Sequence, residues 1–404
     1  MPLNSLIYLL FLGVASILYW SIPQKWRVWI LIVTGILFYA YYSIGYLVLL
    51  LSLSGVTYFV GWLGMRHKDK WNLVVGISIL VLVLALFKYA ARTLVLFQSG
   101  ADMWEIGLPL GISFYTFELI HYLAEVYRGT IKQVNIGTFF AFILFFPTRT
   151  SGPIKRYQDF AEQTRSIVFE SKYLLYGIAL LLLGFFQKIV IADPLIPITS
   201  ALQSPQTLTG SFDAFVRLVL YSIRIYADFM GLTNIAMGSG LLFGILVPRN
   251  FNYPYLQPNI ALFWRNWHMS LSNWVRDYIY IPLGGSRGGA GRTYFNLLMT
   301  MVILGMWHGS SLNFAVWGLY QGLGLCIHRL WRSFPLSLGE RVTRPNDPVR
   351  IGRGERGSMN IPWYWFTYTC GVLLTFIFVT IGWAFFVTNS LGDSITILTL
   401  LFHV

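Results

Sequence analysis

His308 is the strongest candidate for a catalytic residue in this sequence of 404 residues. It follows an uncharged run, residues 293–306, and stands in the triplet Trp307-His308-Gly309. A histidine at the end of such an apolar run costs free energy unless it is used, so a functional site is the default hypothesis. Imidazole titrates near neutral pH, which suits a general base that activates a hydroxyl. A hydrogen-bonded structural histidine is the alternative.

The stretch before this run, residues 263–277, carries polar side chains at helical spacing. As one continuous helix at about 100° per residue, it has a polar stripe opposite a tryptophan-rich face. Such a helix lies in the membrane interface or covers a pocket. A membrane-surface anchor has the same pattern and is the simpler interpretation. The stripe comprises Arg265, His268, Ser272 and Arg276, and the apolar face comprises Trp264, Trp267, Leu271, Trp274 and Val275.

Between these stretches lies a glycine-rich loop, residues 281–292, with Arg287 and Arg292. Backbone N–H groups and Arg287 can bind an anion such as phosphate or pyrophosphate in a loop of this kind. The loop matches neither the P-loop nor the dinucleotide-binding pattern. An anion site and a tight cytoplasmic turn therefore both fit.

Neither the histidines nor the cysteines form a metal-binding pattern. The six histidines are spread over separate segments, whereas zinc needs three or four ligands. Cys326 and Cys370 stand in apolar surroundings without metal or disulfide spacing. We expect no metal and no redox cofactor.

The composition predicts an all-α, polytopic membrane protein. Hydrophobic residues make up 56% and charged residues 11%, where a soluble domain has about 25% charged residues. Apolar stretches of about 20 residues recur, and we expect about 11 transmembrane helices. The net charge of +13 comes from basic residues beside these stretches, so the positive-inside rule explains it better than nucleic acid does.

The loops predict the topology. The first span, residues 6–22, lacks a basic leader and a cleavage site, so we interpret it as a retained helix. A break at 43–45 separates the next two spans. Basic loops at 24–27, 66–70 and 329–357 are predicted to be cytoplasmic, which puts the N-terminus outside.

Three polar residues within one apolar stretch, Glu118, His121 and Glu125, allow two interpretations. They share one helical stripe, which is either a polar seam against neighbouring helices or the lining of a cavity. Residues 139–160 begin with too few apolar residues to cross a bilayer, which favours a re-entrant or buried cytoplasmic-face segment. Arg224 and Asp228, four residues apart, are predicted to pair.

Five stretches between residues 108 and 318 resemble the membrane-bound O-acyltransferase family. Within it, the chain is most similar to the bacterial branch that contains alginate O-acetyltransferase and the teichoic acid D-alanylation protein. The stretches are PLGISFYTFELIHYLAEVYRG, FFPTRTSGPIKRYQDF, YADFMGLTNIAMGSGLLFGILVPRNFNYPY, FWRNWHMSLSNWVRDYIYIPLGGSRGG and MWHGSSLNFAVWG.

This resemblance implies one transmembrane domain, residues 1–404, with re-entrant segments around a central funnel. It implies that His308 is the catalytic histidine and that His268 is the second family histidine. Asp228 matches the acidic position of a Tyr-x-Asp-Phe-Ser-Gly-Tyr motif, from which this sequence departs at Met230 and Leu232. We expect substrate contacts from Trp307, Arg265, Ser272, Arg276, Asp228, Arg287 and Asn313.

The resemblance also implies a reaction. An acyl group, acetyl above all, would come from acetyl-CoA or another acyl thioester, or from an acyl carrier, at the cytoplasmic face of a bacterial plasma membrane. It would pass to a hydroxyl of an envelope or secreted polysaccharide, directly or through an SGNH-type periplasmic acetyltransferase. The alternative is a transporter or flippase without chemistry, which needs no base at His308; the internal repeats common in transporters are not found.

Overall fold

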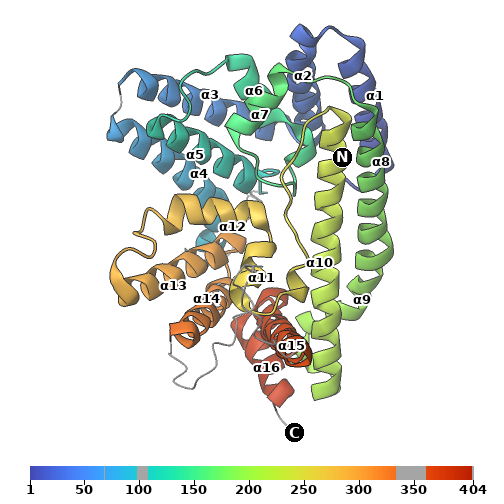
Figure 1. Cartoon of the computed structure of the whole chain (residues 1–404), viewed down its shortest axis with the longest axis vertical. Coiled ribbons are helices and arrows are strands. Elements are labelled where there is room, and N and C mark those ends of the chain that lie inside the picture. Colours follow the sequence, from blue (N-terminus) through green and yellow to red (C-terminus); the bar gives the residue numbers. More distant parts are fainter. Residues whose placement is uncertain (68, 98–107, 334–360, 403–404) are drawn as a thin grey trace, which may run out of the picture. The chain divides into compact units, whose positions relative to one another are not determined.

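The computed structural model describes residues 1–67, 69–97, 108–333 and 361–402, without the side chains of 90–97, 333 and 361–364. These residues form helices and no strands (Figure 1). Residues 329–333, predicted as the start of a basic loop, are instead the end of the helix Leu312–Ser333, and the rest of the predicted loop, to residue 357, lies outside the described residues. The all-α prediction is confirmed.

Four helical segments in the described part of the chain are long and apolar enough to cross a membrane. They confirm a multi-pass membrane protein, and the number of about 11 spans stays a prediction. The segments are Ile44–Arg66, Lys70–Tyr89, Ser171–Gln203 and Trp365–Val387.

The chain divides into two compact units. Unit 1 comprises residues 1–196 and 223–250, and unit 2 comprises residues 197–222 and 251–404. The helix α10 (Ser211–Leu242) contributes its first residues to unit 2 and the rest to unit 1.

Unit 1 begins with helices that end near the predicted breaks, but residues 24–27, predicted as a loop, form the first turn of the helix Gln24–Tyr42. The break near residue 43 is confirmed, because Ser43 ends one helix and its hydroxyl caps the next by accepting from the Tyr46 N–H at 3.4 Å. Its helices are α1 (Leu6–Ser21), α2 (Gln24–Tyr42), α3 (Ile44–Arg66), α4 (Lys70–Phe97), α5 (Ile112–Arg128), α6 (Ile136–Leu144), α7 (Tyr157–Arg165) and α8 (Ser171–Phe185).

The helix between α5 and α7 is too short to cross a membrane. The helix α6 has only 9 residues and continues into a short 3-10 turn, Phe146–Thr148. All residues from 141 to 149 are buried within the protein. Non-helical backbone is tolerated at membrane depth when it is buried in protein, so this segment can lie there. The prediction of a short, protein-buried segment is confirmed.

The polar stripe of α5 holds this segment in place. Buried Glu118 pairs with two buried cations, Arg149 and Lys155, and its Oε1 lies 2.8 Å from the Lys155 Nζ. The other two residues of the stripe hydrogen-bond the Gln158 side chain of α7. The stripe is therefore a polar seam, and the seam interpretation is the correct one.

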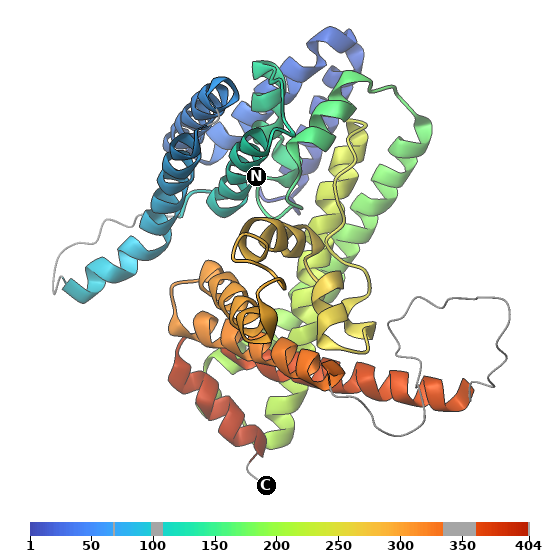
Figure 2. The ribbon, with the colours of Figure 1, turned by 60° about the vertical axis from the view of Figure 1, so that its left-hand side comes forward.

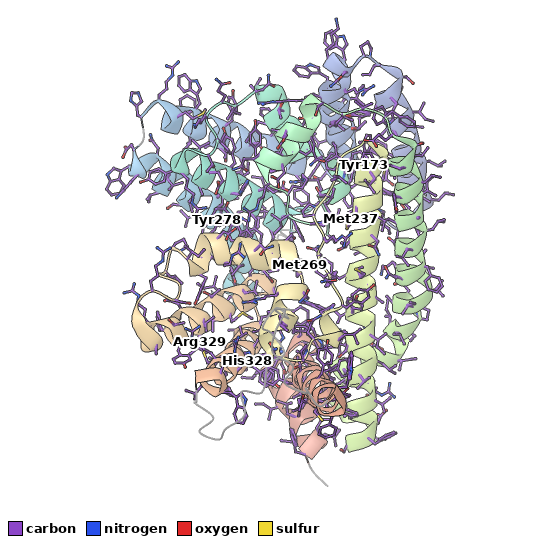
Figure 3. All side chains as sticks on the ribbon, in the orientation of Figure 1. Tyr173, Met237, Met269, Tyr278, His328 and Arg329 are labelled. Atoms are coloured by element: carbon purple, nitrogen blue, oxygen red, sulfur yellow. The ribbon has the colours of Figure 1, made fainter. Side chains whose placement is uncertain are left out.

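Helix α8 and the unit 1 part of α10 lie side by side (Figures 1 and 2). Glycines permit this approach, because a Cβ at Gly177 or Gly184 would crowd the carbonyl oxygen of Gly238 or Gly231. Beyond Phe185, α8 continues as a π-helical turn, Phe186–Ala192. Tyr173 on α8 and Met237 on α10 mark the pair in Figure 3.

Unit 2 contains the predicted central stretch, and one prediction there is wrong. Residues 263–277 do not form one helix, since the chain turns at His268, whose φ is 44°. Unit 2 contains α9 (Ile196–Thr199) apart from its first residue, the start of α10, α11 (Ile260–Asn266), α12 (Met269–Val275), α13 (Gly289–His308), α14 (Leu312–Ser333), α15 (Ile361–Val387) and α16 (Leu391–Phe402), with a π-helical turn at Arg276–Tyr280 after α12. Met269, labelled in Figure 3, is the first residue of α12.

Candidate active site

His308 is the last residue of α13 and lies among aromatic rings of unit 2. Its ring centroid is 4.6 Å from that of Trp307, 5.2 Å from that of Trp317 and 5.0 Å from that of Phe386. The side chain is half-buried. The imidazole is thus fixed by packing and still reachable, as a general base requires.

Glycines bring α13 and α14 into close contact next to His308. A Cβ at Gly305 would collide with the carbonyl oxygen of Phe314, and one at Gly309 would collide with the Phe314 ring. A Cβ at Gly318 would meet the carbonyl oxygen of Met301. The helix hairpin therefore holds the end of α13 at one position, and with it the histidine.

His268 lies in the turn between α11 and α12, in a left-handed conformation that is uncommon for residues other than glycine, although histidine, asparagine and aspartate adopt it more often than most. It is 4% exposed, and its ring centroid is 6.4 Å from that of Trp307. Strained backbone of this kind gathers at functional sites. The indole of Trp307 is therefore a neighbour of both predicted histidines.

His268 lies outside the four candidate spans, and burial lowers the pKa of its imidazole to about 3. The ring is therefore neutral at physiological pH. A neutral ring has one N–H donor and one acceptor nitrogen. His268 is thus suited to orienting a hydroxyl or a neighbouring ring rather than to binding an anion.

Four tryptophans pack against one another beside His308. Trp317 stacks on Trp383 with ring centroids 5.9 Å apart, and Trp264 and Trp267 contact this pair at 5.7 and 5.5 Å. All four are buried, as are Leu271, Trp274 and Val275, so the residues predicted to be apolar-facing are buried but do not lie on one helix. Trp383 and Phe386 of α15 were missed, because no motif marks them.

Asn313 and Ser272, both predicted to contact substrate, make structural hydrogen bonds. The buried Asn313 Nδ2 donates to the Thr388 carbonyl and hydroxyl oxygens, each at 3.1 Å, and so ties the start of α14 to the end of α15. The Ser272 hydroxyl donates to the Trp267 carbonyl oxygen at 3.1 Å and closes the turn at His268.

The three arginines predicted to contact substrate are exposed, and Arg265 and Arg276 do not share one helix as predicted. Arg265 lies near the end of α11, and Arg276 lies beyond the turn, paired with Asp277 at 2.9 Å. The loop that carries Arg287 is an ordered turn, because the buried Asn296 Nδ2 donates to the Gly285 carbonyl oxygen at 2.9 Å. The interpretation of this loop as a tight turn is confirmed. Its role in anion binding stays a prediction.

Asp228 belongs to unit 1 and pairs with a cation that the sequence did not indicate. The Lys188 Nζ lies 2.7 Å from the Asp228 Oδ1 and 2.6 Å from the Asp193 Oδ1. Lys188 is in the π-helical turn after α8, and such turns are frequent at functional positions. Sequence spacing suggested Arg224, since a lysine on another helix cannot be found from local spacing.

The described residues contain no cluster of three or more side chains that can hold a metal ion. Fold and site together define a helical membrane protein with a half-buried histidine in an aromatic setting, suited to base catalysis on a hydroxyl.

The comparisons with known proteins agree with this class. The model of the membrane-bound O-acyltransferase family matches residues 35–335. A probable alginate O-acetylase, AlgI, of Pseudomonas aeruginosa is 34% identical over 403 residues, which are 95% of this chain and 71% of that protein. A peptidoglycan O-acetyltransferase of Helicobacter pylori is 29% identical over 419 residues, covering 93% of this chain and 73% of that protein.

A third relative covers less of the chain. The teichoic acid D-alanyltransferase of Bacillus subtilis is 34% identical over 230 residues, which are 53% of this chain and 57% of that protein. The chain belongs to the membrane-bound O-acyltransferase family. It is an O-acyltransferase, and the family and relatives favour an enzyme over a transporter.

Proposed function

We propose that this protein acylates a polysaccharide hydroxyl, with acetyl as the acyl group and His308 as the general base. The observation that carries the proposal is the position of His308, half-buried and next to the ring of Trp307, which also neighbours His268. The relatives named for O-acetylation of alginate and peptidoglycan support a polysaccharide acceptor and an acetyl group.

The reaction needs one proton transfer and one bond exchange. His308 takes the proton of the acceptor hydroxyl, and the oxygen attacks the carbonyl carbon of an acyl thioester such as acetyl-CoA. The C–S bond breaks, and the leaving thiolate receives the proton from the imidazolium. A thioester is already activated, so the proposal includes no metal and no redox cofactor.

The proposal also covers the surroundings of the enzyme. It includes a bacterial plasma membrane, an N-terminus outside, a central funnel that leads to His308, and a donor or acyl carrier at the cytoplasmic face. The acceptor is then an envelope or secreted glycan, reached directly or through an SGNH-type periplasmic acetyltransferase. Basic residues at the α1–α2 and α3–α4 turns support this orientation.

The test compares ester-linked acyl groups on envelope and secreted glycans from cells with wild type and with His308→Ala. A matched control is His67→Ala, because His67 is exposed in the turn after α3. We expect the ester to disappear only in His308→Ala at equal membrane abundance, and the released acid identifies the acyl group. Unchanged ester content in His308→Ala contradicts catalysis by His308 and restores the transporter hypothesis.

A further inference from the structure

One end of unit 1 contains an open pocket that the proposed acyl transfer does not use. The first turns of α2 and α6 and the last turn of α7 form it, and its volume is about 610 Å³. Its polar lining comprises Gln24, Lys25, Asn135, Thr138, Thr164 and Arg165.

The charged side chains that line this pocket, Lys25 and Arg165, are both positive. None of the described residues that line it is acidic. Lys25 and Arg165 are both exposed, and neither makes an ion pair with a residue that the structure describes. By contrast, Lys172 and Lys188 of the same unit both pair with carboxylates. Two cations without a carboxylate partner thus border one cavity.

Hydrogen bonds fix the frame of the pocket. The Gln24 Nε2 donates to the Arg165 carbonyl oxygen at 2.8 Å, which joins the start of α2 to the end of α7 and keeps Lys25 and Arg165 on the same pocket. The Asn135 side chain caps α6 by accepting from the Thr138 N–H at 3.0 Å. The starts of α2 and α6 add partial positive charge to that of the two side chains, and the end of α7 adds partial negative charge.

The remaining lining is apolar and suits the membrane surface. Val28 and Trp29 line the same pocket, and Trp29 is 50% exposed. Tryptophan is enriched at the level of lipid headgroups. The basic turns place this end of the unit at the predicted cytoplasmic face, where anionic phosphates are concentrated.

We propose that this pocket binds a phosphate group. Arginine and lysine donate charge-assisted hydrogen bonds to phosphate oxygens, and the absence of acidic residues from the described lining removes repulsion. The phosphate belongs either to the headgroup of an anionic phospholipid or to a soluble phosphorylated molecule. The site does not depend on the proposed acyl transfer.

The test measures binding to the purified full-length protein with two probes. Native mass spectrometry compares phosphatidic acid with diacylglycerol, which lacks the phosphate, and titration calorimetry uses adenosine 3′,5′-bisphosphate. The double variant Lys25→Gln/Arg165→Gln is expected to weaken phosphate binding by about tenfold or more. Arg66→Gln/Lys70→Gln is the matched control, because it removes two exposed charges of unit 1 that do not line the pocket.

A second variant tests the pocket without removing a cation. Thr138→Glu puts a carboxylate at the third position of α6, where glutamate favours the helix start, so the protein is expected to fold and to lose phosphate binding. Variant-sensitive binding of phosphatidic acid alone identifies a lipid headgroup, and variant-sensitive binding of the bisphosphate identifies a soluble ligand. Equal binding by wild type and the pocket variants, or an equal loss in the control variant, overturns the proposal.

Discussion

The imidazole of His308 stands edge-on to the indole of Trp317, with ring centroids 5.2 Å apart and ring planes at 89°. Edge-to-face contact is a preferred geometry of aromatic pairs. Because Trp317 also stacks on Trp383 of another helix, the orientation of the histidine ring depends on packing between α14 and α15. Variants of these rings therefore test how the base is positioned.

Trp317→Phe is expected to retain part of the ester-forming activity, since a smaller ring keeps the aromatic face. Trp317→Ala is expected to destabilise the protein by about 3–5 kcal/mol, because the residue is 1% exposed and its removal leaves a cavity. Thermal unfolding in detergent and glycan ester content are the measurements. If Trp317→Phe loses as much activity as Trp317→Ala although both are stably folded, the indole itself is required and an aromatic face is not enough.

His268 provides a test of backbone strain. Asparagine tolerates a φ of 44°, so His268→Asn is expected to reach normal membrane abundance, whereas the β-branched His268→Val is expected to lose about 1–3 kcal/mol of stability. Ester content then separates the role of the imidazole from that of the turn. If His268→Val is as stable as His268→Asn, residue 268 does not have a left-handed backbone.

The contact between α13 and α14 predicts opposite effects of one substitution at two glycines. Gly305→Ala forces a methyl group against the Phe314 carbonyl oxygen and is expected to cost about 1–3 kcal/mol and to reduce activity. Gly291→Ala, on the same helix, meets nothing within 4 Å and is expected to be neutral or stabilising by up to about 1 kcal/mol. Unfolding temperatures of the two variants decide this, and a neutral Gly305→Ala contradicts the close contact.

The seam of α5 predicts a large loss of stability from a small change. Glu118→Gln removes the carboxylate that both Arg149 and Lys155 contact and leaves two buried cations without it, at a cost of about 3–5 kcal/mol. The control, Glu162→Gln, changes an exposed carboxylate and is expected to stay within about 0.5 kcal/mol of wild type. Similar unfolding midpoints for both variants would mean that the buried charges find other partners.

The sequence by itself determined the class of this protein and the identity of its main candidate residue. Apolar length and sparse charge predicted helices in a membrane, the short apolar start of residues 139–160 predicted a segment that does not cross, and the triplet at His308 indicated the candidate site. These features are local, because helix length, helix breaks and membrane partition depend on neighbouring residues.

The tertiary structure decided which residues meet. Helical periodicity predicted one helix through His268, but the chain turns there. The periodic pattern of polar and apolar residues does not reveal a single residue with a left-handed backbone. The partner of Asp228 is Lys188, and the ring beside His308 from α15 is Phe386, and neither can be read from spacing. Contacts between residues distant in sequence arise from the packing of helices against one another, which local patterns do not encode.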